Sequence, residues 1–147
     1  GTGYAEIEDF MRFCDAAYHD KMRAMITFSS SMAQKIYSGA DLFLMPSKSE
    51  PCGLAQLISM RYGTIPVVHA VGGLKDTVVP YNPAEGTGNG VNFQSYNAWD
   101  MYDAIMRGIA IWSDPEERDQ IMLNGMSGDY SWDVSADKYL KLYESVL

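Results

Sequence analysis

Glu50, Cys52 and Gly53 fall in one short stretch whose residue types can hold an anion and act on what it carries. An apolar run at 42–45, typical of a short buried strand, precedes the stretch, and apolar residues at helical spacing follow from Leu54. Gly53 is predicted to open a helix, where unpaired backbone N–H groups and the helix dipole favour an anion and the missing Cβ permits close approach. Glu50 lies just upstream. The stretch predicts a phosphate site, with a solvated helix end as the alternative.

A second glycine-bearing loop, at 69–74, follows the next predicted strand, at 64–68. It contains Gly72 and Gly73, which permit a tight turn or the close approach of another group. Because the carboxyl ends of parallel strands meet at one edge of a sheet, the two loops are expected side by side where ligands bind. His69 is also in this loop; a lone histidine more often makes structural hydrogen bonds than takes part in chemistry, and that interpretation is favoured.

Hydrophobic spacing and capping residues predict an α/β protein: a Rossmann-like parallel sheet covered by helices on both faces, with a helical C-terminal extension. Strands are expected at 22–28, 41–45, 64–68 and 91–93, and helices at 7–18, 32–39, after Gly53 up to Gly63, 97–112, 114–125 and 131–143. A glycine- and proline-rich segment at 81–92 is predicted to be a mobile loop. The methionine and aromatic stripes are interpreted as core, including the last helix, whose inward face would carry Trp132, Ala136, Tyr139, Leu140 and Tyr143.

The 147 residues suffice for one domain with a hydrophobic core. A net charge of −8 argues against a nucleic-acid partner, because counterions are displaced from phosphates by basic residues. No apolar run is long enough for a membrane span, so no membrane partner is expected. Cys14 and Cys52, far apart in sequence, indicate no disulfide framework and fit a reducing cytoplasm.

The Glu-Pro-Cys-Gly-Leu core at 50–54, within 47–57, resembles the signature of bacterial glycogen synthases and plant starch synthases. Neighbouring segments resemble the same family, so the likeness covers essentially the whole chain: these are 36–41, 44–47, 61–78, 86–93 and 131–132. The resemblance implies a two-domain GT-B glycosyltransferase, of which residues 1–147 form part of the C-terminal, donor-nucleotide-binding domain.

The resemblance also implies a reaction. The family transfers glucose from ADP-glucose to the non-reducing end of an α-1,4-glucan with retention of configuration, and uses no metal or other cofactor. The implied partners are ADP-glucose or ADP, and a glucan acceptor bound mainly by an N-terminal domain that this chain lacks. The implied location is the cytoplasm, or the plastid in a plant. The chain alone is expected to be inactive, because catalysis requires all groups to converge on one donor.

The resemblance assigns roles within the motif residue by residue. Glu50 matches the acidic residue beside the donor glucose, where a carboxylate accepts hydrogen bonds from sugar hydroxyls and stabilises positive charge at the anomeric carbon. Backbone N–H groups around Cys52, Gly53 and Leu54 would hold the diphosphate. Ala55 stands where a hydroxyl residue is common, which removes one phosphate hydrogen bond.

The remaining donor contacts are also assigned by the resemblance. Phe28 falls where relatives use a tyrosine to stack the nucleobase, and an aromatic face suits that role. Gly72 and Gly73 would let the second loop pass close to the sugar.

Departures from the wider GT-B pattern keep alternatives open. Ile58 stands where related families carry a second glutamate, which favours the glycogen and starch synthase group, and an upstream Arg/Lys pair is missing. One alternative is a GT-B enzyme that uses UDP-glucose. Another is a non-enzymatic module that binds glucan or a protein partner, for which exposed aromatic residues would be the sign. Trp99, Trp112 and Trp132 are instead expected to be mostly buried.

Overall fold

The structure, a computed structural model, describes residues 2–146, and the chain forms two compact units, one ending at Ile36 and the other beginning at Tyr37. In the first unit, α1 (Ala5–Ala17) forms as its spacing predicts, but none of its residues is buried, and Cys14 is only half-buried. The start of α2 (Ser30–Gly39) is capped by Ser29, whose hydroxyl accepts from the N–H of Met32 at 3.2 Å.

The strand predicted at 22–28 is wrong. Residues 22–26 have no regular secondary structure, and the strands that form the sheet belong to the second unit. A strand is completed by ladder hydrogen bonds to a neighbour, and an apolar run does not specify whether that neighbour exists.

The second unit is built on a three-stranded parallel sheet in the order β1 (Leu42–Met45), β2 (Ile65–His69), β3 (Val91–Phe93). Every residue of the central strand β2 is buried. Pro66, which lacks a backbone N–H, lies near the start of the strand as the second residue of β2 and pairs in register with Phe43. The parallel sheet of the predicted α/β fold is confirmed.

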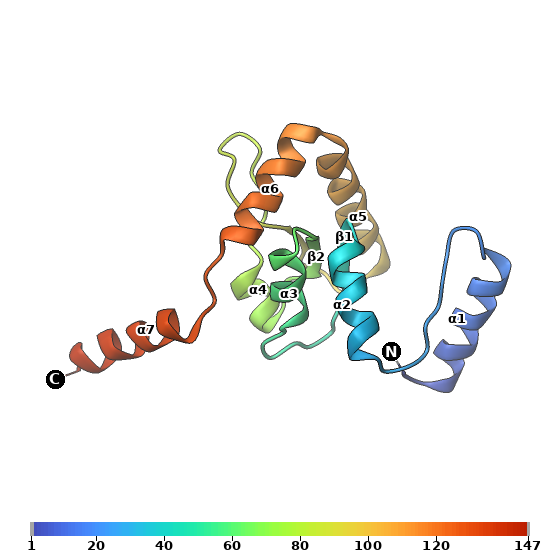
Figure 1. Ribbon diagram of the computed structural model, residues 1–147, viewed down its shortest axis with the longest axis horizontal. Helices are drawn as coiled ribbons and strands as arrows, with labels where there is room; N and C mark the ends of the chain where they lie inside the picture. The colour runs from blue at the N-terminus through green and yellow to red at the C-terminus, as the bar shows by residue number, and fades with distance from the viewer. Residues whose placement is uncertain (1, 147) are drawn as a thin grey trace. The chain divides into compact units, whose positions relative to one another are not determined.

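Helices cover both faces of this sheet, as predicted (Figure 1). Successive residues of a strand point to opposite faces. Val67 packs in a cluster with Ala104 of α5 (Ala98–Ser113), whereas Val68 packs in a second cluster with Leu74 of α4 (Gly72–Thr77). Gly108 brings α5 close to the sheet, since a Cβ there would lie 3.2 Å from a methyl group of Val67. The helix α4 was not anticipated from the sequence.

The helices that follow the sheet begin where their capping residues predict. The Asn97 side chain accepts from the N–H groups of Trp99 and Asp100 at the start of α5. The Asp114 side chain accepts from two backbone N–H groups in the first turn of α6 (Pro115–Ser127). The stretch from Gly125 to Gly128 ends α6 as expected, since the helix stops at Ser127 and Gly128 is its C-cap. Gly125 is buried, and a Cβ there would lie 3.3 Å from Met60 Cβ in α3 (Ala55–Arg61).

The last helix, α7 (Trp132–Glu144), corrects the core prediction. None of its residues is buried, and its aromatic and leucine side chains are exposed. Trp132 is 86% exposed and Trp99 81%, against the expectation that they are buried, while Trp112 is 36% exposed. The Ser131 side chain makes no capping hydrogen bond. Amphipathic spacing identifies an apolar face, but it does not state what covers that face.

The loop expected at 81–92 is folded back on itself. Asn82 and Thr87 form an isolated antiparallel bridge. The Asn124 side chain of α6 donates to the carbonyl oxygens of Gly86 at 2.9 Å and Gly88 at 2.7 Å. The loop is therefore held against α6 before the chain enters β3.

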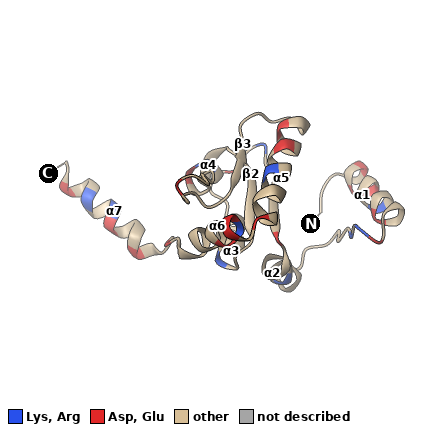
Figure 2. Ribbon diagram, turned by 90° about the horizontal axis from the view of Figure 1, so that it is seen from above, with Lys and Arg blue, Asp and Glu red and all other residues tan. Residues whose placement is uncertain are grey.

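Figure 2 shows Lys and Arg scattered along the helices among more numerous Asp and Glu, in keeping with 11 basic and 19 acidic residues. Within residues 2–146, each helix is too short or too polar to cross a lipid bilayer.

Candidate functional site

The two glycine loops meet at the carboxyl edge of the sheet, as predicted. The N–H of Gly73 donates to the carbonyl oxygen of Glu50 at 3.1 Å. A Cβ on Gly72 would clash with the Glu50 carbonyl oxygen, and one on Gly73 would lie 2.6 Å from both Cys52 Cα and its carbonyl carbon. Only glycine fits at these two positions, because the opposing atoms belong to the backbone and cannot turn aside.

The first loop presents unpaired backbone donors. Gly53 has a φ of +74°, a conformation that favours glycine. Among residues 2–146, no hydrogen bond is made by the N–H of Gly53 or of Leu54. The helix α3 begins at Ala55, two residues later than the sequence predicts, so these donors belong to the loop and not to the first helical turn.

Glu50 is the acidic group beside these donors. Its backbone carbonyl accepts from Gly73, and its side chain is half-buried. Its carboxylate has no hydrogen bond or ion pair with any other described residue of the chain. Both carboxylate oxygens are therefore free to accept hydrogen bonds from a ligand.

The structure brings together most of the predicted site residues. The residues that share the edge of the sheet are Glu50, Cys52, Gly53, Leu54, Ala55, Gly72 and Gly73. Phe28 belongs to the other unit, and its ring is 88% exposed. The cluster at the sheet edge is therefore built from the second unit.

His69 is structural, as the sequence favoured. Its Nδ1 lies 2.7 Å from the carbonyl oxygen of Ser47, and its Nε2 lies 3.2 Å from that of Gln94. The ring is buried and packs against Phe93 and Tyr96 at centroid distances of 5.4 and 5.3 Å. The imidazole thus ties the loop after β1 to the segment after β3.

Gln56 and Thr77 were missed in the sequence. The apolar spacing of α3 draws attention to Leu57 and Ile58, but the buried residues of this helix are Gln56, Ser59 and Met60. The Gln56 side chain is fully buried between the two loops and bonds to Thr77 of α4 at 3.1 Å. The available signal was a glutamine three residues after Gly53, in the first turn of the helix.

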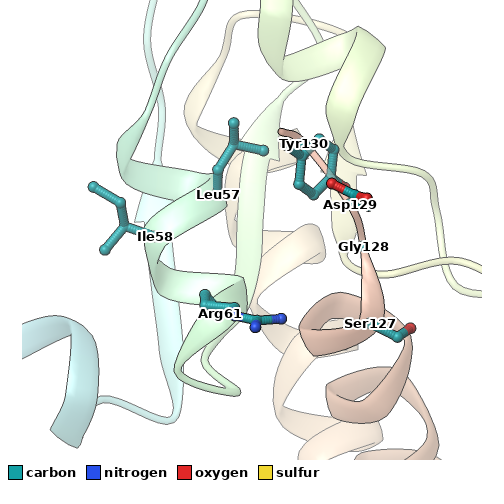
Figure 3. Close-up of a pocket in the computed structure, with 7 residues that line it drawn as sticks. All are labelled: Leu57, Ile58, Arg61, Ser127, Gly128, Asp129 and Tyr130. Atoms are coloured by element: carbon teal, nitrogen blue, oxygen red, sulfur yellow. The ribbon is translucent and has the colours of Figure 1, made fainter. Parts of the chain in front are cut away.

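A separate pocket, of about 630 Å³, lies on the second unit between α3 and the segment at 127–130, and contains none of the predicted site residues. Figure 3 shows Arg61 extending from α3 towards this segment. The guanidinium donates to the carbonyl oxygen of Met126 at 2.7 Å. The pKa of the Asp129 carboxyl lies below its usual range because the N–H and hydroxyl of Ser131 donate to it and Arg61 is nearby. Arg61 and Asp129 give the pocket polar groups, but neither Glu50 nor the two glycine loops line it.

Metal-ligating residues do not cluster in the described part of the chain: residues 2–146 contain no group of three or more His, Cys, Asp or Glu placed to hold an ion. The site therefore consists of a free carboxylate, two free backbone N–H groups and a glycine-lined wall. This arrangement suits a ligand that is anionic at one end and rich in hydroxyl groups at the other.

Residues 3–125 match the family described as "Glycosyl transferases group 1", and the chain belongs to this family. Within it, the chain is similar to glycogen synthases. It is 47% identical over 147 residues to the glycogen synthase of Clostridium novyi (strain NT), covering 100% of this chain and 31% of that protein. It is also 47% identical over 146 residues to that of Bacillus subtilis (strain 168), covering 99% and 30% respectively.

A solved structure agrees with this relationship. The catalytic domain of starch synthase IV from Arabidopsis thaliana, bound to ADP and acarbose, superposes with a TM-score of 0.84 at 32% identity, over 97% of this chain and 30% of that one. The GT-B fold and the likeness to glycogen and starch synthases predicted from the sequence are thus confirmed. A sucrose-phosphate synthase from Thermosynechococcus elongatus shares the fold, with a TM-score of 0.68 at 24% identity. The chain spans about 31% of the length of the glycogen synthases it matches.

Proposed function

We propose that this chain is part of the C-terminal, donor-binding domain of a retaining α-1,4-glucan synthase that transfers glucose from ADP-glucose. The family match and the similarity to glycogen synthases support this class of reaction. The starch synthase structure bound to ADP and acarbose supports a nucleotide and a glucan as the classes of ligand.

The observation that carries the proposal is the pair of unpaired N–H groups on Gly53 and Leu54 beside the free carboxylate of Glu50. Negative charge grows on the diphosphate as its bond to glucose breaks, so backbone donors aimed at it stabilise the transition state more than the ground state. Fixed backbone groups do this without reorganising at the moment of reaction.

Glu50 is assigned to the sugar. Its carboxylate accepts hydrogen bonds from glucose hydroxyls and stabilises the positive charge that develops at the anomeric carbon. Gly72 and Gly73 let the second loop lie directly against the backbone of Glu50 and Cys52, which keeps that loop close to the proposed sugar position. Cys52 contributes backbone, Ala55 supplies no hydroxyl, and Phe28 is assigned to the nucleobase.

The chain alone is proposed to be inactive. It spans about 31% of the length of its glycogen synthase relatives, so most of the groups expected to converge on donor and acceptor lie elsewhere in such proteins. The assay is elongation of a short α-1,4-glucan with radiolabelled ADP-glucose. Incorporation above a no-protein control by the purified chain would contradict this part of the proposal.

Donor binding is tested by titrating the ¹⁵N-labelled chain with ADP and, separately, with UDP. Saturable shifts of the backbone amide signals of Cys52, Gly53 and Leu54, larger with ADP than with UDP, are expected. Equal or larger shifts with UDP would favour the UDP-glucose alternative. Shifts confined to other residues would place the diphosphate elsewhere and refute the assignment of the loop.

A glucan-binding module is the second candidate, and the exposure of Trp99 and Trp132 favours it. Exposed indole rings stack on sugar faces and change their fluorescence when they do. Titration with maltoheptaose while tryptophan emission is followed separates the two candidates. Saturable quenching that Trp99→Ala and Trp132→Ala abolish, together with no response to ADP, would favour the module.

A further inference from the structure

The Gln56 carboxamide occupies the point where the two glycine loops meet. Its side chain is fully buried. Its Nε2 lies 2.8 Å from the carbonyl oxygen of Gly53 and 3.3 Å from that of Cys52. On its other side, Nε2 lies 3.1 Å from Thr77 Oγ1, whose hydroxyl donates to the carbonyl oxygen of Gly73 at 2.6 Å.

The hydrogen-bond partners fix the orientation of this amide. The single hydroxyl proton of Thr77 is used by Gly73, so Thr77 Oγ1 can only accept from Gln56, and the two loop carbonyl oxygens also only accept. The nitrogen must therefore face all three neighbours, with Oε1 turned away. Oε1 is buried without a hydrogen-bond partner among the described residues. An unpaired buried oxygen is destabilising, so the amide is not explained as filler for the core.

The direction of the loop donors follows from this bond pattern. In a planar trans peptide the C=O and the N–H point in opposite directions. Gln56 draws the carbonyl oxygens of Cys52 and Gly53 inward. The N–H groups of the same two peptides, which belong to Gly53 and Leu54, must then point outward, and both are unpaired among the described residues.

We propose that Gln56 is a positioning residue that aims the N–H groups of Gly53 and Leu54 at the donor diphosphate and couples them to the second loop through Thr77. This inference rests on the proposed function for the identity of the ligand, but not for the direction of the donors. The chain of bonds closes through Gly73, whose N–H holds the Glu50 carbonyl. One buried amide thus fixes the diphosphate donors relative to the second loop, whose Gly73 in turn holds the backbone of the acidic residue.

Gly53 packs against the Gln56 amide, and only a residue without a side chain fits there. A Cβ there would lie 2.5 Å from Gln56 Oε1 and 2.9 Å from Nε2. The carboxamide therefore packs flat against the glycine, and the loop cannot take a larger residue without expelling it. The inward direction of the Cys52 and Gly53 carbonyl groups therefore depends on a glycine at position 53, which leaves room for the Gln56 amide.

Two separate measurements test the direction of the N–H groups and the affinity for ADP. Gln56→Met keeps the length and approximate volume of the side chain and removes the amide. Residual dipolar couplings of the ligand-free ¹⁵N-labelled chain report the direction of each N–H. The couplings of Gly53 and Leu54 are expected to change in Gln56→Met while those of the sheet do not. The dissociation constant for ADP is expected to rise about tenfold, equivalent to about 1.4 kcal/mol, near the value of one hydrogen bond.

Thr77→Val provides the second variant, and it carries the test if Gln56→Met does not fold. It removes the hydroxyl that joins Gln56 to Gly73. A rise of about threefold in the dissociation constant is expected, and the double variant should bind no more weakly than Gln56→Met, because both act through one chain of bonds. Ile121→Val is the control: it lowers stability from a buried position in α6, but both readouts should stay at wild-type values.

Unchanged Gly53 and Leu54 couplings in folded Gln56→Met and Thr77→Val would overturn the inference. So would an effect of Ile121→Val on these couplings as large as that of Gln56→Met, because it would reveal a general loss of stability. Failure of the proposed function gives a different pattern: the couplings change in the variants, but the wild-type chain shows no ADP-dependent shifts at these amides.

Discussion

Gly73→Ala tests whether the two glycine loops touch in solution. Gly73 is buried, and an added Cβ would lie 2.6 Å from the Cys52 Cα and carbonyl carbon, closer than real Cβ atoms approach their neighbours. Backbone atoms cannot rotate away, so one loop must move and the hydrogen bond from Gly73 to Glu50 must lengthen or break. Gly73 isolates this contact, whereas Gly72 would add the strain of its positive φ of +47°.

The magnitude follows from these two effects. Overpacking a filled site costs about 1–3 kcal/mol, and loss of a hydrogen bond costs about 1 kcal/mol, so the free energy of unfolding should fall by about 2–4 kcal/mol. For a chain of this size, about 3 °C of melting temperature corresponds to each kcal/mol, which predicts a fall of about 6–12 °C.

The assay is thermal and urea unfolding followed by circular dichroism. Gly39→Ala is the matched control, because it makes the same chemical change at a position where a Cβ meets nothing within 4 Å. Gly39→Ala should melt at or slightly above the wild-type temperature. If Gly73→Ala melts within about 2 °C of Gly39→Ala, well short of the expected fall, the reasoning from loop contact is refuted.

Two further predictions concern other parts of the second unit. Asn124→Ala removes the donor to the carbonyl oxygens of Gly86 and Gly88, so it should lower the free energy of unfolding by about 1–3 kcal/mol and speed amide hydrogen exchange in the 81–92 loop. Unchanged exchange in this loop would contradict the inference that Asn124 holds it. The pKa of the Asp100 carboxyl is lowered, chiefly by a hydrogen bond from the Ser95 side chain. The ionised carboxylate therefore stabilises the folded chain above the ordinary aspartate pKa, and this stabilisation is lost as the pH falls through the lower pKa of the folded state. The melting temperature of wild type should accordingly drop more steeply in acid than that of Asp100→Asn, and parallel curves would contradict the assignment.

The helix starts were predictable from the sequence because capping is local. Asn97 and Asp114 each bond to N–H groups two or three residues ahead, so the spacing of residue types contains the whole interaction. The short strands at 42–45 and 91–93 were predictable for a related reason, since a run of apolar residues between turn signals fits a buried strand.

The failures share a cause. The strand expected at 22–28 and the inward face expected for α7 both required partners that the pattern does not specify. Gly125 lies inside α6 and allows the helix to approach Met60 closely, a packing role that the sequence pattern does not show because it depends on a residue 65 positions away. Local propensity yields to packing at such positions.

The candidate site likewise has features that the sequence shows and features that only the folded chain shows. The sequence by itself determined the motif, the acidic Glu50, the glycine turn at Gly53 and the family resemblance, because these reside in the order of residue types along a short stretch. Only the tertiary structure decided that Gly73 holds the Glu50 loop and that Gln56 turns the Cys52 and Gly53 carbonyls inward. Burial and hydrogen-bond direction depend on groups that folding brings together, and the sequence pattern does not show which groups come into contact.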